Sequence, residues 1–463
     1  MVEHPILEKL KRKTRMIINK TIPAGLSSLN NSQRIIAEDL LSKVEKSLKS
    51  NVEVEMENRV FSIKGGSGFG KSFLTAVLVG ELKQMCSKII ITATTHRALA
   101  NINNMASEHK VASSTIHSYL KCKVHENYQT GTVELIQDTS KTPESVDILF
   151  VEEASMISQA LWDILQNELF KNNVKVVIFI GDHAQLKSVD KDDENPIYCG
   201  YVPLTEYKLT EVVRQAKDST IFKVSNYFRE QIETQQFKPF SDPIQVIKDN
   251  QGEDFVVVNK IDDFYNEFVK TPFKDSAILV HKNSTVAMYN KKARLLEYGK
   301  VPNIIPMERL IFNSSHTVGD ETIHYNNQEV TVKSCELVYD ENNDIEYWQC
   351  ITEEDTMFRV IDTSSKPEYD DRLKELAIEA KKAVGAVKTA LWERYFTLKN
   401  TFQDVIPRYS FSTYKSQGST IKYVYIDINE LSSLSGFLSP DELYRLLFVS
   451  ISRASDKVVF FIK

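Results

Sequence analysis

The segment Gly65-Gly66-Ser67-Gly68-Phe69-Gly70-Lys71-Ser72 fits the phosphate-binding pattern G-x-x-x-x-G-K-[ST] without a mismatch. The apolar run at 59–63 predicts a buried strand before it, and 73–78 predicts the start of a helix after it. In that context the glycines let backbone N–H groups converge on phosphate oxygens. Lys71 supplies charge to the β- and γ-phosphates, and Ser72 can ligate Mg²⁺. The stretch therefore predicts a site for a nucleoside triphosphate.

Composition limits the class of protein. The chain has 463 residues, more than one hydrophobic core usually serves, so two to four structural units are expected. It has no apolar run of the ~18–20 residues that a membrane span needs and no signal-peptide core, so a cytoplasmic protein without membrane partners is expected. Five scattered cysteines without a C-x-x-C pair argue against a disulfide framework or a zinc site.

The formal net charge of −6 is not typical of a protein that coats nucleic acid through bulk positive charge. Any nucleic-acid site must therefore be local. A basic N-terminal extension spans residues 1–25, and its cationic side chains are Lys9, Lys11, Arg12, Lys13, Arg15 and Lys20. We interpret it as a solvated helix rather than a nucleic-acid arm.

Short apolar runs alternate with helical patterns from residue 26 to about 215, which is typical of a parallel α/β sheet. The expected strands at 60–63, 88–91, 148–151 and 176–180 are each followed by polar residues at the carboxyl end, where open α/β sheets bind ligands. A second α/β pattern has expected strands at 276–280, 423–426 and 458–461. Two insertions are also indicated. Residues 121–125 and 131–135 predict a hairpin, and 303–360 is β-rich, whereas 367–400 has helical spacing.

Polar residues after the later strands are candidate catalytic groups. Glu152 and Glu153 follow the third expected strand, where Glu152 would hold the metal and Glu153 would polarise the attacking water. Gln185 follows the fourth strand and offers a neutral amide to the γ-phosphate. Arg214 and Arg453 each follow an apolar stretch. Either could be a surface residue, but as a pair they suggest arginine fingers that stabilise charge on the transferred phosphoryl group.

The order of these motifs resembles that of superfamily 1 helicases, and most closely the RecD-like (superfamily 1B), Dda-type helicases of tailed bacteriophages. The resemblance covers nearly the whole chain and implies an α/β fold with two RecA-like P-loop NTPase domains. It implies ATP and Mg²⁺ as cofactors. By resemblance, Gln33 reads the adenine, and Gly418 joins the ATP-binding residues of the phosphate loop.

Three further segments resemble family motifs that contact DNA. Two of them, Thr94-Thr95-His96-Arg97-Ala98 and Ser114-Thr115-Ile116-His117-Ser118, lie in the first domain and resemble strand-gripping motifs. The third, Ser412-Thr413-Tyr414-Lys415-Ser416-Gln417-Gly418-Ser419-Thr420, resembles the motif that couples DNA to the triphosphate. On spacing alone the two histidines would more often be structural. The implied DNA contacts are Thr94, His96, Thr115, His117, Ser412, Tyr414 and Lys415.

The resemblance also implies the domain boundaries. The first RecA-like domain covers 26–119 and 148–215, interrupted by a strand-separating pin at 120–147. The second covers 216–302 and 405–463, interrupted at 303–404 by an accessory insertion with an SH3-like β-barrel and a helical arm that braces the pin. Tyr128 is the aromatic residue near the expected pin tip, where it could stack on a base or simply pack. Trp392 and Tyr395 on the arm are expected to be packing residues.

The implied activity is ATP-dependent translocation along single-stranded DNA, with 5′→3′ polarity, and unwinding of forked duplexes in phage replication or recombination. Two departures from the family pattern are Glu152, where an aspartate is usual, and Tyr414, where a histidine is usual. A helicase-fold module that clamps single strands with weak motor activity, or an RNA helicase, are the alternatives. A monomer in the host cytoplasm is expected, with replication or recombination proteins such as a single-strand binding protein as possible partners.

Overall fold

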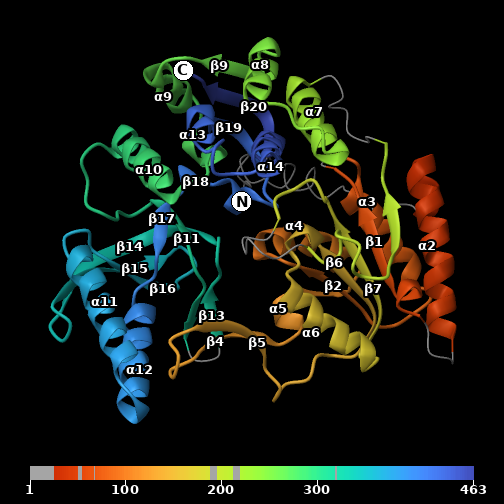
Figure 1. The fold of residues 1–463 in the computed structure, drawn as a ribbon, viewed down its shortest axis with the longest axis horizontal. Coiled ribbons are helices and arrows are strands. Elements are labelled where there is room, and N and C mark those ends of the chain that lie inside the picture. The colour runs from red at the N-terminus through yellow and green to blue at the C-terminus, as the bar shows by residue number, and fades with distance from the viewer. Residues whose placement is uncertain (1–24, 51–54, 67, 188–194, 212–218, 319–320) are drawn as a thin grey trace, which may run out of the picture.

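The computed structural model describes residues 25–50, 55–66, 68–187, 195–211, 219–318 and 321–463 (Figure 1). The N-terminal extension before residue 25, Ser67 and Arg214 lie outside these ranges. Two parallel sheets, one antiparallel sheet and two small hairpins make up the β-structure of the described chain. The two expected α/β domains are therefore confirmed.

The first domain contains six strands, and every neighbouring pair is parallel. In sheet order these are β3 (Ala112–Thr115), β2 (Ile89–Ala93), β6 (Val146–Glu152), β7 (Val174–Gly181), β1 (Val60–Lys64) and β8 (Thr205–Lys208). Four of these strands, β1, β2, β6 and β7, are those that the sequence predicted, in this order, at 60–63, 88–91, 148–151 and 176–180. Alternate side chains of these strands enter two separate cores, as a sheet covered on both faces requires.

Helices cover both faces of this sheet. The helices on one face are α2 (Asn31–Lys49), α3 (Lys71–Leu82) and α4 (His96–Glu108), and those on the other are α5 (Ile116–Tyr119) and α6 (Gln159–Phe170). A capping box starts α2, because Asn30 accepts from the backbone N–H of Gln33 while the Gln33 side chain accepts from that of Asn30. This cap fixes where Gln33 lies relative to the sheet.

The second domain repeats the arrangement with five parallel strands, in the order β18 (Ser410–Ser412), β10 (Ser276–Val280), β19 (Ile421–Asp427), β20 (Ala454–Phe461) and β9 (Phe255–Val258). One face packs on α7 (Thr220–Thr234), α8 (Ser241–Asp249), α13 (Ile428–Ser433) and α14 (Pro440–Ser452). The other face packs on α9 (Ile261–Lys270) and α10 (Asn283–Tyr298). The helices α7 and α14 share one buried core, so they form one side of this domain.

An inserted unit separates β10 from β18. Its antiparallel sheet has the order β16 (Met357–Ile361), β15 (Ile345–Thr352), β14 (Glu329–Asp340), β11 (Arg309–Phe312) and β17 (Val405–Pro407). A small hairpin, β12 (His316–Val318) and β13 (Glu321–His324), lies within it, and α11 (Lys366–Lys382) and α12 (Gly385–Thr401) form the helical arm. Since β17 pairs with β11, the insertion extends past the boundary expected at residue 404. The SH3-like form of this unit stays a prediction.

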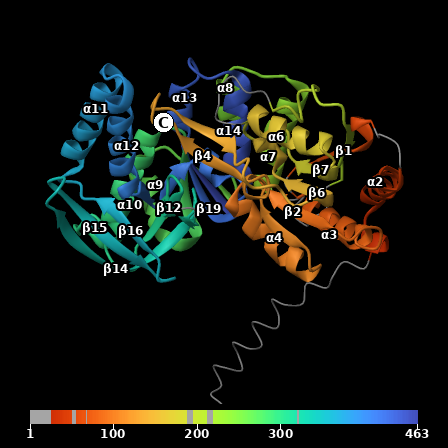
Figure 2. The same cartoon turned by 90° about the horizontal axis from the view of Figure 1, so that it is seen from below.

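The second hairpin, β4 (Cys122–Glu126) and β5 (Val133–Gln137), lies where the pin was predicted. Figure 2 places the inserted sheet and its arm at one end of the molecule and α2 at the other. Short 3-10 turns complete the described elements, at η1 (Gly25–Ser28), η2 (Met56–Asn58), η3 (Ala154–Met156), η5 (Phe273–Asp275) and η6 (Thr413–Ser416). No helix in the described ranges is long and apolar enough to cross a membrane.

Candidate nucleotide site and strand-binding surface

The phosphate loop joins β1 to α3, as its sequence predicts. Gly68 and Gly70 have φ values of +86° and +76°, which glycine adopts without strain. The Lys71 ammonium donates to the carbonyls of Gly65 at 2.7 Å and Gly66 at 3.1 Å, so it lies within the loop. Ser72 is exposed in the first turn of α3. The loop therefore presents a cation and a hydroxyl at a helix N-terminus, which suits a phosphate.

Gln33 lies against this loop. Its side chain is buried, and its Nε2 is 3.4 Å from the Phe69 carbonyl oxygen and 3.5 Å from that of Gly70. Its Oε1 accepts from the Asn30 N–H at 3.3 Å. The amide is thus beside the nucleotide loop but bonded to protein groups, which a base would have to replace. Its adenine-reading role stays a prediction.

Glu152 and Glu153 follow β6 at the carboxyl edge of the sheet. Glu152 is buried and accepts from the Thr75 hydroxyl at 3.1 Å. Burial and the charge of Glu153 raise its pKa to about 7, although Lys71 and Thr75 oppose the shift. Glu153 has a left-handed backbone, with φ of +54°, a strained conformation that is common at functional sites.

These residues fit the Mg²⁺ that the resemblance implies. A buried carboxylate next to a second carboxylate is unfavourable as an anion unless a cation is near, which is what the raised pKa of Glu152 expresses. Carboxylate and hydroxyl oxygens, here from Glu152 and Ser72, are the ligands that Mg²⁺ prefers. When bound, Mg²⁺ would neutralise charge on the β- and γ-phosphates.

The segment after β7 supplies the next group of polar residues. Asp182 is completely buried, and its Oδ1 accepts from the Ala184 N–H at 3.1 Å. Its Oδ2 and the Oε1 of Gln185 are buried without a hydrogen-bond partner. Buried polar atoms are normally bonded, so unsatisfied ones at a sheet edge indicate a site built for a ligand.

The second domain contributes cationic side chains to the same place. Arg453 caps α14, is buried, and has Nη1 3.4 Å from the Ser419 carbonyl oxygen. Burial lowers the pKa of its guanidinium, while the charges of Glu153 and Asp182 raise it. Arg445 of α14 donates to the carbonyls of His183 at 2.5 Å and Gln185 at 2.7 Å. The structure thus brings Lys71, Glu153, Gln185 and Arg453 close to one another between the two domains, and their catalytic roles stay predictions.

The strand-gripping residues of the first domain lie at the same edge. The Thr94 hydroxyl donates to the Glu153 carbonyl at 3.2 Å, and the Thr115 hydroxyl caps α5. The His96 ring stacks on Tyr325 of the insertion with 3.5 Å between centroids. Burial lowers the pKa of both His96, to about 4, and His117, so both rings are neutral at physiological pH. Their DNA contacts stay predictions.

The coupling motif contacts both the insertion and the first domain. The Lys415 ammonium donates to Asn313 Oδ1 at 2.5 Å, and the backbone carbonyl of Lys415 accepts from Arg97 at 2.8 Å. Burial lowers the pKa of Lys415 to about 8. Ser412 caps η6, whereas the Tyr414 ring packs on the second domain core. Gly418, with φ of +73°, lies next to Ala98 of the first domain.

The hairpin β4–β5 packs on the helical arm. The Tyr128 ring is 5.8 Å from that of Phe396, and Asn400 donates to Glu126 at 2.8 Å. Gly131 lies so close to Trp392 that an added Cβ would overlap the indole. The Tyr128 ring thus packs against α12 while 39% of its surface stays exposed, and its stacking on a base stays a prediction. Trp392 is buried, which confirms its expected packing role.

Arg229, like Arg445, is a cationic residue at this site that was not predicted. Arg229 of α7 is 5% exposed, and its guanidinium lies over the Phe69 ring at 5.0 Å. It is 3.6 Å from Asp182 Oδ1 and 2.8 Å from Glu233 Oε1. Nothing local in Tyr227-Phe228-Arg229-Glu230 distinguishes this arginine from one on the face of an ordinary helix. Only the packing of α7 against the phosphate loop identifies it.

Comparisons with known proteins agree with this geometry. A family model described as an AAA domain matches residues 49–191. An uncharacterized protein of Acanthamoeba polyphaga mimivirus is 22% identical over 94% of this chain and 100% of its own length. The RecBCD enzyme subunit RecD of Buchnera aphidicola is 26% identical, and the match covers 67% of this chain and 50% of that protein.

Among solved structures, one titled for DNA unwinding at forked duplexes by two coordinating Pif1 helicases has a TM-score of 0.51 at 15% identity. That likeness covers 94% of this chain and 93% of the other, and it supports the fold. The finer resemblance to the Dda-type helicases of tailed bacteriophages stays a prediction. In its motif order, its two parallel-sheet domains and these likenesses, the chain is similar to the superfamily 1B helicases.

Proposed function

We propose that this chain is an ATP-dependent DNA helicase that translocates 5′→3′ along single-stranded DNA and unwinds forked duplexes in replication or recombination. The observation that carries the proposal is the buried Arg453 of the second domain, which lies within electrostatic reach of Glu153 and Asp182 of the first. A nucleotide site divided between two domains is sensitive to their relative position. ATP can therefore favour closure, and its hydrolysis can favour separation.

Each side chain has a specific proposed role. Lys71 would bind the β- and γ-phosphates, and Glu153 would accept a proton from the attacking water. Gln185 would orient the γ-phosphate or its leaving form. Arg453 would stabilise charge on the transferred phosphoryl group, and Arg214, outside the described residues, is proposed to act with it. Ser72 and Glu152 would hold Mg²⁺.

The path proposed for the single strand crosses both domains. Thr94 would link the strand to the proposed base Glu153, since the Thr94 hydroxyl donates to the Glu153 carbonyl at 3.2 Å. On the second domain, the Gln417 amide donates to the Leu186 carbonyl at 3.2 Å, next to Gln185. A change in how the strand is held can thus reach the nucleotide through a few contacts. The similarity to a RecBCD enzyme subunit and to Pif1 helicases that unwind forked DNA favours DNA as the strand.

The test measures ATP hydrolysis with and without single-stranded DNA, followed by unwinding of duplexes with a 5′ or a 3′ overhang. We expect DNA to stimulate hydrolysis, Lys71→Ala to abolish it, and only the 5′ overhang to support unwinding. Unwinding from the 3′ overhang alone would overturn the polarity. Hydrolysis that does not respond to DNA would instead favour the strand-clamping module.

A further inference from the structure

We propose that Arg229 is a further phosphate-recognising residue of the nucleotide site, supplied by α7 of the second domain and selective for the triphosphate. This inference rests on the proposed ATPase function and adds a residue that the family motifs do not include.

The position of Arg229 is the first argument. A Cβ added to Gly66 would lie 2.9 Å from Arg229 Nε and 2.8 Å from the Phe69 ring, so the guanidinium reaches the loop backbone closely. Lys71 donates to the carbonyl of the same Gly66 at 3.1 Å. Arg229 and Lys71 therefore lie beside the same loop residue, and Lys71 is the residue expected to bind the β- and γ-phosphates.

The bonding of Arg229 is the second argument. Its Nε and Nη2 are buried, and neither has a partner in hydrogen-bonding geometry, although Nη2 is at ion-pair distance from Glu233. An arginine has five N–H donors in a planar fork that matches phosphate oxygens. A buried guanidinium that is paired by charge but incompletely hydrogen-bonded is suited to exchange a carboxylate for a phosphate.

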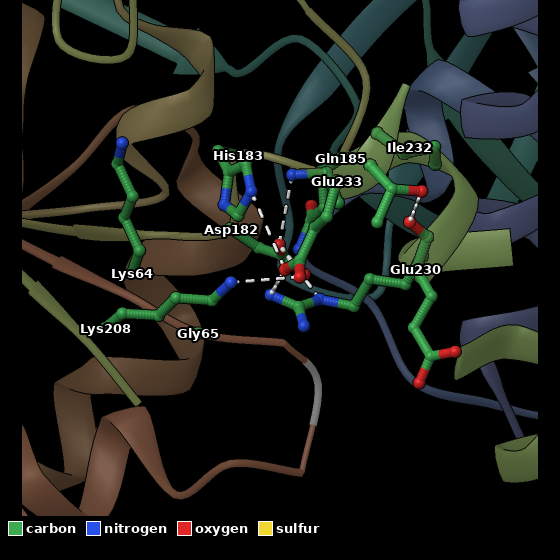
Figure 3. Close-up of polar contacts among 12 residues, drawn as sticks. Lys64, Gly65, Asp182, His183, Gln185, Lys208, Glu230, Ile232 and Glu233 are labelled. Carbon is green, nitrogen blue, oxygen red and sulfur yellow. Dashed lines mark hydrogen bonds and ion pairs between the residues drawn. The ribbon is translucent and has the colours of Figure 1, made fainter. Parts of the chain in front are cut away.

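The surrounding charges make that exchange feasible. Glu233 also contacts Lys208 at 3.0 Å and His183 at 3.7 Å, so it keeps cationic or polar neighbours when Arg229 leaves (Figure 3). Asp182 already accepts from the Ala184 N–H. Asp182 and Glu233 therefore hold Arg229 next to the phosphate loop, and each acid has a further partner besides Arg229.

The attachment of α7 gives the exchange a consequence. The side chains Val224, Phe228 and Ile232 of α7 are buried in the same core as Leu447 and Ile451 of α14, the helix that ends at Arg453. When Arg229 shifts toward a phosphate, Arg453 would thus move with it. The second domain would then grip the triphosphate with two arginines from one rigid side.

The experiment measures the binding of mant-labelled ATP and ADP with Mg²⁺ to the full chain, for wild type, Arg229→Gln, Arg229→Lys and Glu233→Gln. We expect Arg229→Gln to lose about tenfold or more in ATP affinity, with less than about twofold change for ADP. Arg229→Lys keeps the charge but not the planar fork, so its ATP affinity should lie between those of Arg229→Gln and wild type. It replaces Arg229→Gln in the test if that variant does not fold. Glu233→Gln should bind ATP at least as tightly as wild type.

Equal losses for ATP and ADP, or none, in both Arg229 variants would overturn the proposal. So would a Glu233→Gln variant that loses as much ATP affinity as Arg229→Gln, since the ion pair would then be structural. Failure of the proposed function looks different: wild type would bind neither nucleotide, or Lys71→Ala would bind both normally.

Discussion

Buried polar atoms without hydrogen-bond partners gather at the nucleotide site. Asp182 Oδ2, Gln185 Oε1, Arg229 Nε and Arg453 Nε all belong to this group, and they come from both domains. Leaving such atoms unsatisfied typically costs about 1–3 kcal/mol each, so a fold selected for stability alone would avoid them. Their concentration at one interdomain site is best explained by a ligand that satisfies them.

Replacing the proposed base is the direct test of catalysis. Glu153→Gln keeps the shape of the side chain but removes its ability to accept a proton. We expect DNA-stimulated hydrolysis to fall by about 10²–10⁴-fold, with mant-ATP binding retained. The matched control is Asp163→Asn on α6, an exposed acid that should leave the rate unchanged. A Glu153→Gln variant with normal turnover would remove Glu153 from the mechanism.

Lys415 predicts a pH dependence of strand binding. Burial lowers its pKa to about 8, so the ammonium loses its proton as the pH rises through that value. If Lys415 binds phosphate, single-stranded DNA affinity should fall from pH 7 to 9, and Lys415→Gln should remove most of that dependence. Fluorescence anisotropy at constant ionic strength would measure it.

The lowered pKa of Lys415 has the opposite effect on the stability of the fold, which should rise with pH. Unfolded chains keep an ordinary lysine pKa near 10.4 and bind the proton more tightly. Stability contributed by Lys415 should therefore increase as the pH rises from about 8 toward that value.

A wild-type DNA affinity that is flat across pH 7–9, with Lys415→Gln also flat, would exclude the phosphate contact.

At the scale of elements, the contact between the hairpin and the arm is testable through two glycines. Gly131 has φ of +76° and lies against Trp392, whereas Gly385 has φ of +60° and open space around its Cα. Alanine at either position bears backbone strain of about 1–2 kcal/mol. Only Gly131→Ala must also displace the indole, which adds about 1–3 kcal/mol.

We therefore expect Gly131→Ala to slow unwinding of a forked duplex much more than Gly385→Ala, with DNA-stimulated hydrolysis similar in both. The hairpin would no longer be braced, while the nucleotide site is untouched. Stopped-flow unwinding and steady-state hydrolysis measure the two quantities. Equal unwinding rates for the two variants would show that the brace does not support strand separation.

The elements that could be predicted from sequence have local signals. The phosphate loop has a fixed spacing, and β1, β6 and β7 are apolar runs that end in polar residues. Arg229 and β17 had no such signal. Arg229 is one arginine on a helix, and its role depends on packing against Phe69, far away in sequence. The strand β17 is short and contains a proline, so only its pairing with β11 reveals that it belongs to the insertion.

At the scale of the whole molecule, Glu329 joins three parts of the chain. Its carboxylate lies 2.6 Å from Arg97 of the first domain, 2.9 Å from Arg309 of the insertion and 3.2 Å from Arg408, which precedes β18 of the second domain. Burial raises the pKa of this carboxyl, but the three arginine charges outweigh burial and hold the pKa below its usual value. The carboxylate therefore stays ionised and holds the three guanidinium groups together.

Removing this charge should loosen the junction. Glu329→Gln would leave three guanidinium groups close together without an anion, and because these side chains are only partly buried the cost should lie below the ~3–5 kcal/mol of a fully buried pair. We expect a lower midpoint of thermal unfolding and faster hydrogen exchange at α4 and β14. The control is Glu336→Gln, an exposed acid on the same strand, whose change should stay within about 0.5 kcal/mol.

The depressed pKa of Glu329 also predicts a response to acid. A carboxyl whose folded pKa is depressed stabilises the fold above its unfolded value, near 4.3, and loses that contribution as the pH falls through the folded pKa. Wild type and Glu336→Gln should therefore lose stability in that range, while Glu329→Gln should lose less. If Glu329→Gln matched wild type in both its unfolding midpoint and its acid response, the three arginines would be held by packing alone, and the junction would not depend on Glu329.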